Sequence, residues 1–223
     1  MKKKNNVKEK SSELPYLDEF LLHLQSNNLS PETVYSYEND LSLFAFFLKN
    51  DLKTDFACMT RMAIDKYKAY LASYDRHTAS GSASEKRLSA VSINRMLSSL
   101  RRYLAYLIDI EHQTPIVPNM VKLLKTPKKH ARVAELDILI RFIESPTSFE
   151  KKTNVKLRNR AMLETLFATG MRISELLSLN RDQIDHTGKI FIRGKGRKER
   201  FVYLTDRAKK HINDYLKTRT DDF

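Results

Sequence analysis

Residues 168–179, Ala-Thr-Gly-Met-Arg-Ile-Ser-Glu-Leu-Leu-Ser-Leu, constrain most strongly what this chain can fold into. A pattern of apolar residues at helical spacing precedes them, and Gly170 suits the end of that helix because glycine adopts left-handed conformations freely. Residues 173–179 are apolar at helical spacing and predict a second, short helix. The segment therefore predicts a tight corner between two helices, with Arg172 at the start of the second.

Two runs typical of β-strands follow this corner. Residues 189–193 and 200–204 are rich in β-branched and aromatic residues, and glycines mark the turns around them. Lys195 stands between Gly194 and Gly196, which allow a hairpin tip to approach a ligand closely. The tip is not a Walker phosphate-binding loop, because Lys195 is followed by glycine and not by serine or threonine. The sequence thus predicts a hairpin that carries one lysine at its tip.

Arg172 and Lys195 together suit phosphodiester chemistry that needs no metal. Attack on a phosphodiester gathers negative charge on the non-bridging oxygens, and a guanidinium can bond two of them without losing its charge. Glu175 lies three residues further along the predicted helix, on the same face, where it can hold the arginine in place. Lys195 can protonate the leaving 5′ oxygen. Taken singly, each pattern also fits a plainer interpretation, namely a structural Arg–Glu pair and a solvated basic tip.

The charge of the chain indicates an anionic partner. Its formal net charge is +13 and its isoelectric point is about 9.7, which favours nucleic acid or an anionic membrane surface. The longest apolar run, residues 43–48, is too short to span a bilayer, and no apolar stretch follows the basic N-terminus. Cys58 is the only cysteine, which excludes an internal disulfide or a multi-cysteine zinc site. We therefore predict a cytoplasmic nucleic-acid-binding protein without a metal.

Composition and helical periodicity divide the chain into four parts. Residues 1–12 form a Lys-rich polar run that predicts a disordered basic tail. Residues 13–112 carry four amphipathic helical patterns with short connections, which predict a small helical bundle. Residues 113–132 contain three prolines and a basic run, which predict a linker, and residues 133–223 form a second domain.

The helices of the bundle are expected from near Pro15, from Pro31, after Thr60 and over residues 89–110. Ser30 before Pro31 is a strong start signal, since serine caps helices and proline suits the first helical position. The last of these helices carries an apolar seam and, on the opposite side, a polar row. The seam comprises Ile93, Leu97, Leu100, Leu104 and Leu107, and the row comprises Arg95, Ser99 and Arg102.

In the second domain, helices are expected over residues 135–144, over 155–169 and from Thr205. The middle helix is expected to bury Leu157, Ala161, Leu163, Leu166 and Phe167. Together with the hairpin, these helices predict a mainly α chain with one small β element.

The Arg172 segment and the hairpin run Gly-Lys-Gly-Arg-Lys-Glu-Arg at residues 194–200 together resemble the tyrosine recombinase family of phage integrases and Xer proteins. The resemblance extends from about Leu14 to Leu216, and residues 29–33 and 92–103 match less specific sequence motifs of the same family. It implies a SAM-like, core-binding helical bundle that clamps DNA, followed by an α+β catalytic domain. By the same resemblance Arg172 binds the scissile phosphate, Glu175 supports it and Lys195 acts as general acid.

The resemblance also implies an activity. Members of the family are site-specific recombinases that cut and rejoin duplex DNA through a 3′-phosphotyrosyl link, with no cofactor, as tetramers on two DNA sites. Chromosome partition, phage integration and transposon mobility are the settings it implies.

The chain departs from the family pattern after the hairpin. Members carry a His-x-x-Arg pair, a further His or Trp and a nucleophilic Tyr downstream. None of the six histidines has an arginine three residues later: His23, His77, His112, His130, His186 and His211. Tyr203 lies on the strand just after Lys195, and Tyr215, in the last amphipathic helix, is expected to be core, so neither is placed to be the nucleophile. We therefore expect the DNA-clamping domain and a truncated catalytic domain, which together bind DNA without cleaving it.

Further basic residues are candidates for phosphate contacts, although each also fits a solvated surface charge. These candidates are Lys86, Arg87, Arg95, Arg102, Lys128, Lys129, Arg197, Lys198 and Arg200. Two other functions fit the sequence: a truncated recombinase that acts only as a DNA-binding regulator, and a helical interaction module whose basic charge is incidental.

Overall fold

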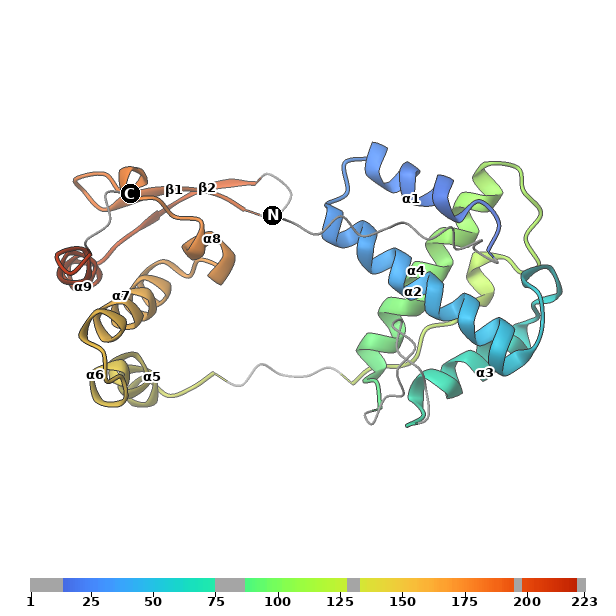
Figure 1. Cartoon of the computed structure of the whole chain (residues 1–223), viewed down its shortest axis with the longest axis horizontal. Coiled ribbons are helices and arrows are strands. Elements are labelled where there is room, and N and C mark those ends of the chain that lie inside the picture. Colours follow the sequence, from blue (N-terminus) through green and yellow to red (C-terminus); the bar gives the residue numbers. More distant parts are fainter. Residues whose placement is uncertain (1–13, 75–86, 128–132, 195–197, 220–223) are drawn as a thin grey trace. The chain divides into compact units, whose positions relative to one another are not determined.

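The computed structural model describes residues 14–74, 87–127, 133–194 and 198–219, and the chain divides after Lys129 into two compact units (Figure 1). The described residues are mostly helical and contain one two-stranded antiparallel sheet. The predicted mainly α class with a small hairpin is therefore confirmed. The basic run at residues 1–12 and the candidates Lys86, Lys128, Lys129, Lys195 and Arg197 lie outside the described residues.

The described residues of the first unit form a bundle of four α-helices with three short irregular helices. The α-helices are α1 (Leu17–Ser26), α2 (Pro31–Phe46), α3 (Arg61–Ala72) and α4 (Ala90–Asp109), and the short ones are η1 (Phe47–Leu52), η2 (Phe56–Cys58) and η3 (Pro118–Met120). Ser30 and Ser89 cap α2 and α4 by accepting hydrogen bonds from the backbone N–H groups of Thr33 and Ser92. All five residues of the predicted α4 seam are buried in one core with α1, α2 and α3.

The expectation that Ser99 lies on the polar side of α4 is wrong. Its side chain is buried and donates a hydrogen bond to the Asp40 carboxylate of α2 over 2.7 Å. Arg95 donates to both carboxylate oxygens of Asp40, over 2.6 and 2.8 Å. Burial raises the pKa of Asp40, while the bonds from Ser99 and Arg95 oppose that rise. Ser99 faces inward because a buried carboxylate on the neighbouring helix needs donors.

Most of the predicted linker belongs to the first unit. Ile116 and Val121 are buried in its core, and η3 lies between them. The Asn94 side chain of α4 donates to the backbone carbonyl of Leu124 over 2.9 Å and accepts from the backbone N–H of Leu124 over 2.7 Å. The prolines do favour an extended chain, but the apolar residues between them hold that chain against the bundle.

The second unit combines helices with the hairpin. It contains α5 (Leu136–Glu144), α6 (Pro146–Phe149), α7 (Thr153–Thr169), α8 (Ile173–Leu177), η4 (Arg181–Gln183), β1 (Lys189–Arg193), β2 (Glu199–Tyr203) and α9 (Asp206–Leu216). The strands pair in register from Lys189 opposite Tyr203 to Arg193 opposite Glu199. The core is small and lies between the sheet, Met171 and Ala208 of α9. None of the described helices is long and apolar enough to cross a membrane.

The expectation for α7 is only partly correct. Ala161 is buried, whereas Phe167 is exposed and Leu157, Leu163 and Leu166 are half-buried. The most buried long side chains of α7 are instead charged, Arg160 and Glu164. Helical spacing alone did not reveal that α7 packs through a charged row.

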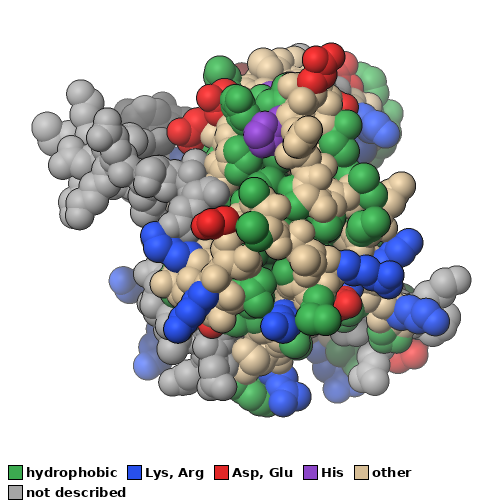
Figure 2. Space-filling model, turned by 90° about the vertical axis from the view of Figure 1, so that its right-hand side faces the viewer, with side chains coloured by type: hydrophobic (Ala, Val, Ile, Leu, Met, Phe, Trp, Pro, Cys, Tyr) green, Lys and Arg blue, Asp and Glu red, His purple; other side chains and the backbone are tan. Residues whose placement is uncertain are grey.

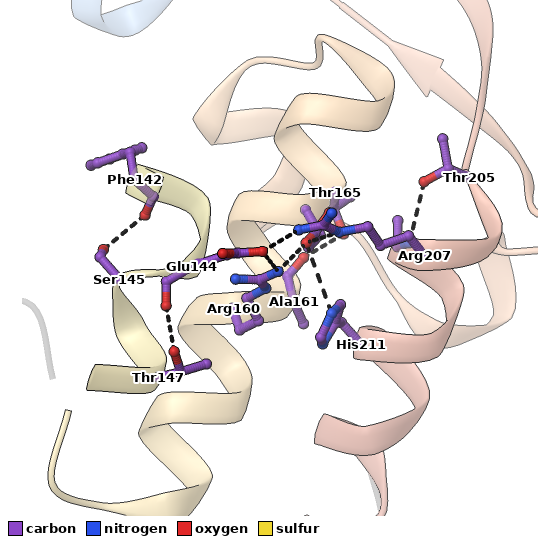
Figure 3. Close-up of polar contacts among 12 residues, drawn as sticks. Phe142, Glu144, Ser145, Thr147, Arg160, Ala161, Thr165, Thr205, Arg207 and His211 are labelled. Atoms are coloured by element: carbon purple, nitrogen blue, oxygen red, sulfur yellow. Dashed lines mark hydrogen bonds and ion pairs between the residues drawn. The ribbon is translucent and has the colours of Figure 1, made fainter. Parts of the chain in front are cut away.

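These charges form a network that joins three helices (Figure 3). Glu164 accepts from Arg160 over 2.7 Å and from Arg207 of α9 over 2.7 Å. Arg207 also donates to Glu144 of α5 over 2.9 Å, and His211 lies 3.8 Å from Glu164. Burial and the two neighbouring arginines lower the pKa of His211. The network therefore links α5, α7 and α9 through ionic contacts.

Candidate functional site

The corner between α7 and α8 places Arg172 as the sequence predicts. Gly170 adopts φ +62° and donates its backbone N–H to Leu166, which ends α7. Met171 is buried in the core of the second unit, so the corner is anchored there. Arg172 follows as the residue that caps the start of α8.

Glu175 holds Arg172 through two hydrogen bonds. The backbone N–H of Arg172 donates to one oxygen of Glu175 over 2.7 Å, and its guanidinium donates to the other over 2.9 Å. The side chain of Glu175 is only 7% exposed, whereas that of Arg172 is 60% exposed. The buried carboxylate of Glu175 therefore holds Arg172 from its protein side and leaves the arginine guanidinium accessible to solvent.

A second arginine reaches the same carboxylate from β2. Arg200 donates to both oxygens of Glu175, over 3.1 and 2.7 Å, in the paired geometry that guanidinium and carboxylate favour. The bonds from Arg200, followed by that from the Arg172 backbone, lower the pKa of Glu175 to about 2. Glu175 is therefore ionised throughout the physiological pH range. Two guanidinium groups and one carboxylate leave the cluster with one net positive charge.

Gly194 lies against this cluster at the end of β1. A Cβ atom at Gly194 would lie 3.0 Å from a Glu175 oxygen, 3.1 Å from an Arg200 nitrogen and 3.4 Å from an Arg172 nitrogen. A larger residue there would require the Glu175 and Arg200 side chains to shift by a few tenths of an ångström, so glycine is the residue that leaves this arrangement undisturbed. Beside the cluster is an open hollow of about 460 Å³, lined by Gly170, Arg172, Gly194, Lys198, Glu199 and Arg200. The arrangement can receive an anion on the exposed side of Arg172.

The other described candidates lie in different settings. Lys198 is exposed and lines the hollow beside Arg172. Arg102 is exposed on α4, and the Arg87 guanidinium lies 4.4 Å from the centre of the Tyr74 ring. Arg95 is bound to Asp40, although just over half of its side chain stays exposed. Tyr203 is exposed, and Tyr215, expected to be core, is half-buried.

Sequence reasoning missed the link between Arg200 and Glu175. Arg200 alternates along β2 with Val202, which is buried, so a charged side chain stands on the inner face of the strand. A charge in that position needs a partner. That alternation was the available signal. Among the described residues there is no group of three or more His, Cys, Asp or Glu side chains that could hold a metal ion.

Each of the two units matches a known protein family. The phage integrase family matches residues 132–223, and the phage integrase N-terminal SAM-like domain matches residues 17–111. The tyrosine recombinase XerC of Pelobacter propionicus is 32% identical over 207 residues, and XerC of Oceanobacillus iheyensis is 34% identical over 209. Both alignments cover 90% of this chain and 62% of the relative, so the chain spans less than two thirds of the length of these relatives.

Solved structures share the fold. A XerH recombinase bound to a palindromic difH substrate is 20% identical, with a TM-score of 0.63 over 90% of this chain and 56% of that one. A lambda integrase tetramer bound to a Holliday junction is 16% identical, with a TM-score of 0.67 over 91% of this chain and 56% of that one. The two matched sequence families, which lie over residues 17–111 and 132–223, and the XerC relatives show that the chain belongs to the phage integrase family of tyrosine recombinases.

Proposed function

We propose that this chain binds duplex DNA at a specific recombination site and supplies the arginine that binds the scissile phosphate. The observation that carries the proposal is the cluster of Arg172, Glu175 and Arg200 beside an open hollow, within the part of the chain that matches the phage integrase family. Arg172 is held on one side and exposed on the other, as a phosphate receptor requires.

The same residues suit strand cleavage in a protein that carries the whole catalytic domain. Arg172 stabilises the charge that develops on the non-bridging oxygens, and Glu175 keeps the guanidinium aligned during the reaction. Lys195 protonates the leaving 5′ oxygen, and a tyrosine hydroxyl attacks the phosphorus to form a 3′-phosphotyrosyl link. That link preserves the energy of the broken bond, so rejoining needs neither metal nor nucleotide cofactor.

Both units contribute positive charge to DNA binding in this proposal. On the face of the first unit seen in Figure 2, Lys and Arg side chains lie mainly over the lower half, and Asp and Glu side chains lie mainly toward the top. Arg87, Arg95, Arg102 and Lys198 are the described residues proposed to contact phosphates. Lys86, Lys128, Lys129 and Arg197 are proposed from the sequence alone.

The family relationship also supports proposals for the assembly and its setting. A solved relative is a lambda integrase tetramer bound to a Holliday junction, which supports a tetramer of recombinase subunits on two DNA sites. A cytoplasmic setting and a role in chromosome partition are proposed from the resemblance to Xer proteins, and relatives that are named XerC are consistent with that resemblance.

A salt titration of this chain on a labelled duplex tests DNA binding. Neutralising about 6–10 phosphates makes affinity fall by about 10³-fold or more between 50 and 200 mM salt. Anionic lipid vesicles serve as the comparison, because a net charge of +13 also attracts membrane surfaces. Tighter binding to the vesicles than to the duplex, or a salt-independent affinity, would contradict the proposal.

A further inference from the structure

Two basic residues of the hairpin differ in their environment although both line the hollow. Lys198 is exposed and makes no ion pair with any described residue, whereas Arg200 is bound by Glu175 through two hydrogen bonds. We propose that Arg200 is a positioning residue, which holds Glu175 so that Arg172 is fixed for its phosphate, and that Lys198 alone of this pair contacts DNA. This inference depends on the phosphate-binding role proposed for Arg172.

The orientation of Arg200 in the sheet supports this assignment. Arg200 pairs with Ile192 of β1, which is buried, and alternates along its own strand with the buried Val202. Only 36% of its side chain is exposed, and its guanidinium nitrogens lie on Glu175. The arginine is therefore directed into the unit, toward the carboxylate.

The geometry around Glu175 explains what Arg200 contributes. Arg172 uses both oxygens of Glu175, one through its backbone and one through its guanidinium. Those two bonds require the carboxylate to keep one orientation, and the paired bonds from Arg200 hold its plane. Gly194 lies close to the same carboxylate, since a Cβ atom placed there would be 3.0 Å from a Glu175 oxygen.

Charge balance gives Arg200 a second effect. Glu175 paired with Arg172 alone would form a neutral group and would weaken the attraction of Arg172 for a phosphate. With Arg200 bound to the same carboxylate, the three groups keep one net positive charge. Arg172 is then both held in place and available to an anion.

Two single substitutions that each remove one charge from the hairpin test the proposal: Arg200→Met, and Lys198→Met as the matched control. The first readout is the dependence of duplex affinity on salt for this chain. Loss of one phosphate contact lowers the slope of log affinity against log salt by about 0.9. We expect that decrease for Lys198→Met. Arg200→Met can lower the slope only by disturbing Arg172, so any decrease in this variant should be accompanied by a change in the NMR signals of Glu175 and Arg172.

The second readout is the pKa of the Glu175 carboxyl, followed by NMR with 13C-labelled glutamate, together with the 15N signal of the Arg172 guanidinium. In the wild type the pKa is about 2. Arg200→Met should raise it and should broaden or shift the Arg172 signal, whereas Lys198→Met should change neither. Arg200→Lys keeps the charge but loses the paired geometry, and should restore the pKa only in part.

Arg200 is instead a DNA contact if Arg200→Met lowers the salt slope by about 0.9 and leaves the Glu175 and Arg172 signals unchanged. If Arg200→Met does not fold, Arg200→Lys still decides: a wild-type pKa and Arg172 signal would overturn the positioning role. Absence of duplex binding by the wild type would refute the proposed function without altering the NMR result, so the two failures are distinguishable.

Discussion

Replacing Glu164 should destabilise the second unit far more than replacing its exposed partner Arg207. Glu164 is 3% exposed and binds Arg160, which is 6% exposed. Among the described residues, Glu164→Gln leaves the buried Arg160 guanidinium with one acidic partner, Glu144 at 3.4 Å. Loss of one member of a buried ion pair costs about 3–5 kcal/mol, and we expect about 3 because the amide oxygen still accepts a hydrogen bond.

Arg207→Met is the matched comparison. Arg207 is 48% exposed, and after its removal Glu164 still binds Arg160 over 2.7 Å. Because Glu164 keeps a charged partner, loss of the exposed Arg207 should cost about 1 kcal/mol or less, so the two variants should differ by about 2 kcal/mol or more. In thermal terms, about 1 kcal/mol shifts the midpoint of a domain of this size by about 4–8 °C.

Amide hydrogen exchange of the α7 and α9 peptides measures this difference within the intact chain. A loss of about 3 kcal/mol speeds exchange through unfolding of the second unit by more than a hundredfold, since 1.4 kcal/mol corresponds to a factor of ten. Peptides of α4 in the first unit serve as the internal control. Equal effects of Glu164→Gln and Arg207→Met on α7 would refute the argument from burial.

Three further outcomes follow from the described contacts. Burial, Arg160 and Arg207 lower the pKa of His211, so its contribution to stability is complete above about pH 6.5 and is lost as the pH falls below that value. His211→Gln should therefore reduce the fall of the thermal midpoint with decreasing pH. A variant whose thermal midpoint depends on pH as the wild type's does would contradict this. Arg95→Met leaves the buried Asp40 carboxylate with Ser99 as its one remaining side-chain donor among the described residues, and should destabilise the first unit by about 3 kcal/mol. Adding Asp40→Asn to the Arg95→Met chain should recover part of that loss, and strictly additive free energies from urea unfolding would exclude this coupling. Residues 1–223 contain no His-x-x-Arg pair, so a nicked suicide duplex should trap no covalent adduct on a denaturing gel, and an adduct lost in Tyr203→Phe or Tyr215→Phe would show that one of these tyrosines is a nucleophile.

Local signals made much of the fold predictable from sequence. Gly170 ends α7 as expected, and Ser30 and Ser89 cap the helices that follow them. The apolar seam of α4 is buried in full. These features depend on neighbours within a few residues along the chain, where side-chain type and helical spacing carry the information.

Charged residues that face inward were not predictable in the same way. Glu175 and Arg200 are separated by 25 residues, and Asp40 and Arg95 by 55, so no local pattern pairs them. Glu164 and Phe167 lie on one helix, yet the charged residue is buried and the aromatic one exposed. Helical periodicity assigns the buried face of a helix to its apolar residues. It therefore fails where an ionic network occupies the buried face, and only the structure reveals such a network.

The proposed phosphate-binding role of Arg172 is tested most directly by asking whether Arg172 contacts one particular DNA phosphate. A duplex selected by this chain from a random pool would be remade with one neutral methylphosphonate at each backbone position in turn. The affinities of the wild type and of Arg172→Ala then form a double-mutant cycle for every phosphate. A charged hydrogen-bonded contact should give a coupling of about 1.5–3 kcal/mol at one phosphate and none elsewhere. Equal losses for both proteins at every position would show that Arg172 binds no particular phosphate, and would contradict the central claim.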